Sequence, residues 1–69
     1  MTSASPLTAR ENEILVLIAA GKRTPQIAEA LGMSPETVRA HRKNMFRKAG
    51  VQSVGQLVDY AWRVGIVKP

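Results

Sequence analysis

The 69-residue chain contains no cysteine, one histidine, and one residue each of tryptophan, tyrosine and phenylalanine. Without cysteine it can form neither a disulfide nor a thiolate zinc site, and one histidine does not supply the clustered ligands that a metal needs. No pair of carboxylates stands in an obvious pocket-forming framework. We therefore expect no cofactor, no metal and no enzymatic activity, in a protein suited to the reducing cytoplasm.

Long apolar runs are also missing. The most apolar stretch, ILVLIAA at 14–20, is much shorter than the roughly 20 residues of a transmembrane helix. The first six residues, MTSASP, lack the apolar segment of a signal peptide. We expect no membrane partner, and we interpret 1–6 as a flexible tail or linker remnant before a single domain at 7–67.

Acidic residues are few: five, against ten Lys and Arg, for a net charge of +5. Half of the bases lie in RAHRKNMFRK at 39–48, and no acid occurs between Glu36 and Asp59. At about 100° per residue, one side of a helix here carries Arg39, Lys43 and Arg47, with Glu36 and Ala40 at nearby angles. The other side carries Val38, His41, Met45 and Ala49. A solvated charged face is one reading, but a basic stripe that lacks acids is typical of nucleic-acid binders. We expect His41 to be partly buried and hydrogen-bonded.

Start and stop signals predict four helices and no strand. Thr8 with Glu11, and Ser53 with Gln56, have the spacing of capping boxes. Thr24–Pro25 and Ser34–Pro35 each read as an N-cap followed by a proline at the first helical position. Glycines at 21, 32, 50 and 65 mark the ends. The expected fold is an all-α, compact four-helix domain with helices at about 8–20, 24–31, 35–49 and 54–64.

The second and third of these helices form the pattern of a helix-turn-helix. The turn at 32–34 is short and contains Gly32, which can adopt a positive φ, and Ala28 is small where the helices would cross. A miniature core is expected from Ile27, Leu31, Met33 and Val38. Because the second helix of this motif enters the DNA major groove, the pattern predicts DNA binding.

Three segments resemble the LuxR-type (GerE- or FixJ-type) helix-turn-helix domain. LTARENEIL at 7–15 is similar to the family opening LTxRExEVL. GKRTPQIAEALGMSPETVRAH at 21–41 follows G-x-x-x-x-x-I-A-x-x-L-x-x-S-x-x-T-V-x-x-H, and RKNMFRKAGVQS at 42–53 continues it. The chain departs from the family at Ala9, often Pro, and at Ala49, usually Leu. We expect Phe46 or Trp62 to offset the apolar volume missing at Ala49.

The resemblance implies a bacterial transcription regulator that binds double-stranded DNA in a sequence-specific manner. It implies that the helix at 35–49 reads the major groove and that the helix at 54–64 forms a homodimer contact. Carried over by position, base contacts fall to Arg39, Ala40 and Lys43. Phosphate contacts are expected from Arg23, Thr24, Thr37, Arg42, Asn44, Arg47 and Lys48. The dimer contact is expected from Val58 and Trp62.

Alternatives remain open at the level of the sequence. A sigma-like or polymerase-contacting adaptor would also carry a helix-turn-helix and a basic face, which makes RNA polymerase a further candidate partner. The chain could be the effector domain of a longer regulator, such as a response regulator, or a small stand-alone regulator like GerE. We expect Glu13 to pair with a base of the helix at 35–49 or to be solvated, and Arg10, Arg63 and Lys68 to be surface charges.

Overall fold

Four α-helices make up the described part of the chain, residues 6–67 of a computed structural model. They are α1 (Ala9–Ala19), α2 (Thr24–Leu31), α3 (Pro35–Ala49) and α4 (Val54–Arg63). The predicted all-α class is confirmed, and every helix boundary lies within one residue of its expected position. Residues 1–5 and 68–69, which include most of the expected tail and Lys68, lie outside the described residues. No helix within 6–67 is long and apolar enough to cross a membrane.

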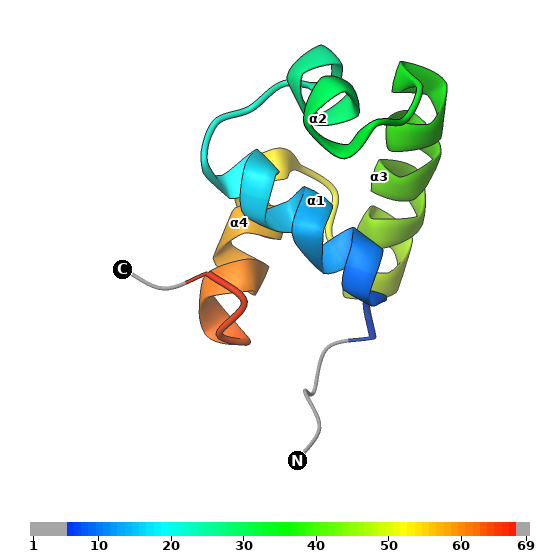
Figure 1. Cartoon of the computed structure of the whole chain (residues 1–69). Helices are drawn as coiled ribbons and strands as arrows, with labels where there is room; N and C mark the ends of the chain where they lie inside the picture. The colour runs from blue at the N-terminus through cyan, green and yellow to red at the C-terminus, as the bar shows by residue number, and fades with distance from the viewer. Residues whose placement is uncertain (1–5, 68–69) are drawn as a thin grey trace.

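Both α1 and α3 contact all three of the other helices, and α2 packs mainly on α3. Figure 1 shows α1 crossing the centre of the molecule, with α3 along one side and α4 on the other. This arrangement leaves the long outer side of α3 uncovered (Figure 1), so the helix that carries half of the chain's Lys and Arg residues packs on the other helices from one side only.

The core draws on all four helices and follows the expected helical spacing. Its buried members are Leu7, Ile14, Leu15, Ile18, Ile27, Ala28, Val38, Met45, Leu57, Tyr60 and Ala61. Val38 and Met45 are fully buried, which confirms the predicted inner side of α3. Phe46 packs against this core, but Trp62 is 46% exposed. Of the two residues expected to offset the small Ala49, only Phe46 is therefore placed to do so.

The turn between α2 and α3 has the geometry that the motif requires. Gly32 adopts φ +66° and ψ +38°, and the N–H of Met33 donates to the carbonyl of Ala28 at 3.0 Å. This bond closes the left-handed helix end that glycine favours. Ser34 then caps α3, its hydroxyl accepting from the N–H of Thr37 at 3.1 Å. The two helices of the motif thus meet through three residues whose conformations are all specified locally.

Two predicted caps differ from the structure. The N-cap of α2 is Arg23 rather than Thr24, because the backbone is extended at Arg23 (φ −97°, ψ 167°) and already helical at Thr24. The Gln26 side chain accepts from the N–H of Arg23 at 2.8 Å. The guanidinium has no acceptor to return that bond. At α4, Ser53 accepts from the N–H of Gln56 at 3.1 Å, but Gln56 accepts from Gln52 at 2.8 Å and not from Ser53. The expected box at 53–56 is therefore replaced by two separate bonds.

Replacing Gly32 by Ala is expected to lower the free energy of unfolding by about 1–2 kcal/mol, because an L side chain is strained in the left-handed region. The added Cβ would meet nothing within 4 Å, so the loss would come from the backbone alone. Gly55→Ala is the matched control. Its Cβ would meet only the Ser53 hydroxyl at 3.9 Å, and the change should stabilise α4 by up to about 0.5–1 kcal/mol. Urea denaturation followed by circular dichroism measures both, and equal effects would contradict the requirement at the turn.

Candidate nucleic-acid interface

The outer side of α3 presents the residues expected to read bases. Arg39, Ala40 and Lys43 are all exposed, as are Asn44 and Arg47 one turn further along. Thr37 is exposed as well, and its hydroxyl lies 2.9 Å from that of Ser34 at the helix start. Because Val38 and Met45 are buried on the opposite side, the reading residues can be substituted without disturbing the core.

Within residues 6–67, the two bases that lie outside α3 and the turn before α2, Arg10 and Arg63, are each paired with an acid. Three close pairs form, each at 2.9 Å: Arg10 with Glu13, Arg63 with Asp59, and Lys48 with Glu11. Within residues 6–67, the bases that pair with no acid are Lys22, Arg23, Arg42, Lys43 and Arg47. All five lie on α3 or in the turn before α2. The net positive charge is therefore concentrated on one part of the surface.

Two elements distant in sequence bring phosphate-directed residues together. A pocket is lined by Arg23 and Thr24 at the start of α2, by Arg42 of α3, and by Ile18, Gly21, Lys22 and Val54. The N–H groups and the dipole of a helix start favour anions. Lys22 was not among the expected phosphate contacts. Its place directly before the α2 start is the signal in the sequence that could have found it.

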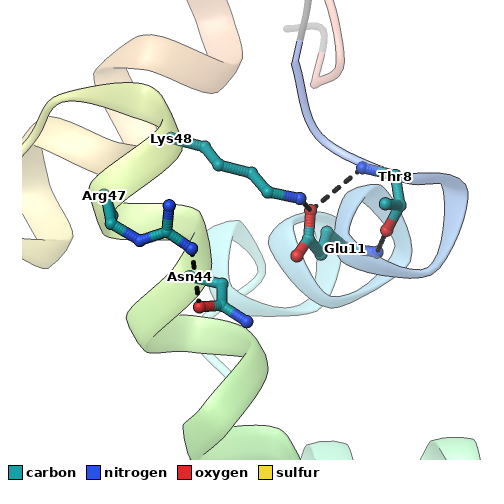
Figure 2. A network of polar contacts seen from close by, with 5 residues as sticks. All are labelled: Thr8, Glu11, Asn44, Arg47 and Lys48. Atoms are coloured by element: carbon teal, nitrogen blue, oxygen red, sulfur yellow. Dashed lines mark hydrogen bonds and ion pairs between the residues drawn. The ribbon is translucent and has the colours of Figure 1, made fainter.

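Lys48 joins α3 to α1. Its ammonium donates to Oε1 of Glu11 at 2.9 Å, and the same oxygen accepts the N–H of Thr8 at 3.0 Å (Figure 2). Glu11 in turn completes the predicted capping box, its own N–H donating to the Thr8 hydroxyl at 3.1 Å. Of the two expectations for Glu13, pairing with α3 is wrong: its side chain is 56% exposed to solvent and pairs with Arg10 on its own helix.

Glu11 stays ionised although it is only 3% exposed. Burial by itself raises the pKa of its carboxyl. The hydrogen bonds from Lys48 and Thr8, with the charges of Lys48 and His41, outweigh that effect and hold the pKa below the usual value for glutamate. His41 is half-buried, as expected. It makes no side-chain hydrogen bond within the described part of the chain, contrary to expectation, and acts on Glu11 through its charge.

An apolar row runs along α4. Val54 and Trp62 are 44% and 46% exposed, Val58 is half-buried, and the spacing of four residues places the three on one face. Tyr60, in contrast, is buried in the core. The residues expected at a dimer contact are therefore accessible on the surface.

A helix-turn-helix whose second helix is buried on one side and basic on the other defines a DNA-binding domain. Comparison with known families agrees with this class: residues 5–61 match the GerE model of bacterial regulatory proteins of the LuxR family. The chain belongs to this family. Residues 5–61 are thus a LuxR-type DNA-binding domain.

The chain is similar in sequence to two bacterial regulatory proteins. The transcriptional regulatory protein MctR of Rhizobium johnstonii is 47% identical over 62 residues, which cover 90% of this chain and 29% of MctR. The response regulatory protein YgeK of Escherichia coli K12 is 45% identical over 65 residues, 94% of this chain and 44% of YgeK. The chain thus spans less than half the length of these two relatives.

Two solved structures share the fold closely. The transcription factor GerE superposes with a TM-score of 0.84 at 35% identity, covering 90% of this chain and 92% of GerE. VqmA of Vibrio cholerae, in a complex with ligand and DNA, superposes with a TM-score of 0.80 at 39% identity, covering all of this chain and 31% of VqmA.

Glu11→Gln is expected to lower the free energy of unfolding by about 1–3 kcal/mol at neutral pH, because Lys48 loses its charged partner. Glu13→Gln removes an exposed pair and should cost under about 1 kcal/mol. The pKa of Glu11 is depressed by folding. Its contribution is therefore full above the unfolded value of about 4.3 and is lost as the pH falls through the folded value. Denaturation at pH 7 and pH 3 should show the difference between wild type and Glu11→Gln shrinking, and a difference that persists at pH 3 would contradict the ionic role.

Proposed function

We propose that this chain binds double-stranded DNA in a sequence-specific manner, with α3 in the major groove, and that two copies pair on the DNA. The observation that carries the proposal is the sorting of charge. Within residues 6–67, the Lys and Arg residues without an acidic partner lie on α3 and in the turn before α2, while Arg10, Arg63 and Lys48 are each neutralised by an acid. Neutralising phosphates with such bases releases counterions, so affinity should fall steeply as salt is raised.

The contacts divide into base reading and positioning. Arg39 and Lys43 can donate to O6 and N7 of guanine, and the methyl group of Ala40 can meet the methyl group of thymine. Positioning on phosphates falls to Arg23, Thr24 and Arg42 at the pocket, with Lys22 added. Thr37, Asn44 and Arg47 extend these contacts along α3. Lys48 contributes less, since its charge is already paired with Glu11.

Pairing through α4 is supported by the exposed row Val54, Val58 and Trp62. The related VqmA is described as a dimer whose conformation shifts in the absence of its target DNA. We propose that two copies of this chain likewise come together mainly when half-sites hold them. The row is small, so the contact alone should be weak.

Arg39→Ala or Lys43→Ala is expected to weaken binding to a preferred duplex by about 1–3 kcal/mol, with a smaller loss on a scrambled duplex. Arg47→Ala should weaken both duplexes equally, because a phosphate contact does not depend on sequence. Arg10→Ala is the control, since Arg10 pairs with Glu13 on α1. Fluorescence anisotropy measures all four. Equal losses on both duplexes for Arg39→Ala would remove its base-reading role, and retention on RNA polymerase without duplex binding would favour the adaptor.

Trp62→Ala is expected to weaken the pairing of two copies on a duplex with two half-sites, while binding to a single half-site stays unchanged. Val16→Ala is the matched control, because Val16 is 45% exposed on α1 and outside the row on α4. Sedimentation with and without DNA gives the number of chains in each case. A tight dimer without DNA would contradict the proposed order of assembly.

A further inference from the structure

One acid stands within the basic outer side of α3. Glu36 is the only acidic residue of this helix, and its side chain is 81% exposed. At about 100° per residue, Glu36 lies between Lys43 and Arg47 in angle. A carboxylate at this point lowers the attraction of the surface for every phosphate, whatever the DNA sequence.

The position of Glu36 makes it a base-facing residue. It lies in the first turn of α3, one turn before Arg39 and Ala40. In a helix-turn-helix, the N-terminal residues of the second helix are the ones that contact base edges. The proposed function, on which this inference rests, therefore carries the Glu36 carboxylate into the major groove together with Arg39.

The ordinary explanations of Glu36 account for little. An acid in the first turn of a helix interacts favourably with the helix dipole, but the hydroxyl of Ser34 already caps this end. The pair with Arg39 is long, 4.0 Å between Oε2 and the guanidinium nitrogen, and both side chains are more than half exposed. Exposed pairs of this kind contribute little to stability. The pair can instead hold Arg39 near the start of the helix until guanine replaces the carboxylate.

We infer that Glu36 is a specificity-determining residue that reads an exocyclic amino group, that of cytosine N4, beside the base pair read by Arg39. A carboxylate can only accept hydrogen bonds. It is satisfied by the amino donor of cytosine and repelled by the acceptor atoms of guanine and thymine. Adenine also presents an amino donor, but its N7 acceptor lies beside that group and repels a carboxylate. Glu36 thus lowers the general affinity for DNA and adds discrimination between bases at one position of the site.

The test compares Glu36→Gln with Glu29→Gln in the full 69-residue chain. Both remove one negative charge, and Glu29 is an exposed acid on α2 that forms no ion pair among the described residues. Binding-site selection from random duplexes, followed by anisotropy on the selected site and its single-base variants, gives the preference at each position. Circular dichroism melting shows that both variants fold.

Glu36→Gln should lower the preference for cytosine at one position by about fivefold or more, with other positions unchanged, and should raise affinity for unrelated duplexes. Glu29→Gln should leave every preference unchanged. Glu36→Asp keeps the charge on a shorter side chain, so it should weaken the preference without raising the general affinity. Matching profiles for Glu36→Gln and Glu29→Gln, with selective binding by the unchanged chain, would overturn this inference alone. Failure of the unchanged chain to bind any duplex would overturn the proposed function as well.

Discussion

The ion pair between Glu11 and Lys48 is the contact on which the placement of α3 depends. Among the ion pairs of the described residues it alone joins two helices, since the other three connect positions three or four apart. It is also the pair with a nearly buried carboxylate, 4% exposed at the side chain. Breaking such a pair would leave an unpaired charge buried away from water, which is unfavourable. The pair therefore holds the last turn of α3 against the first turn of α1. Val38 and Met45 add apolar contacts on the same inner side of α3.

The rest of the charge distribution follows from that attachment. Glu11 pairs with Lys48 at the end of α3, and Glu13 and Asp59 each pair with a base on their own helix. Few acids are left for the outer side of α3 and the turn before α2. With five acids and ten bases in the chain, the location of the acids decides where the positive potential remains. The positive surface proposed to bind DNA is thus defined as much by the scarcity of carboxylates as by where lysine and arginine occur.

What could be predicted from the sequence is what depends on near neighbours. The turn at Gly32, the cap at Ser34 and the box at Thr8–Glu11 each involve residues within five positions, and all three are confirmed. Contacts between residues far apart in the sequence are harder to predict. Glu13 was the acid expected to pair with α3, whereas Glu11 makes that pair, because only the packing of α1 on α3 shows which acid faces inward. Lys48 did carry a signal: at about 180° from Arg39 on the helix, it falls beside the inner His41 and not with the reading residues.

This division of α3 into two sides explains how one fold can serve different DNA sequences. The inner side is used entirely for packing, since Val38 and Met45 have no exposed surface. A smaller side chain at either position would open a cavity in the core. The outer side makes no contribution to the core at Arg39, Ala40 and Lys43, all of which are exposed. Under the proposed function, substitutions at these positions would alter base contacts at little cost in stability. Glu36 belongs to the same side, and in the proposed role its charge would favour discrimination over affinity. Base preference can consequently change one residue at a time while the helix that presents those residues stays in place.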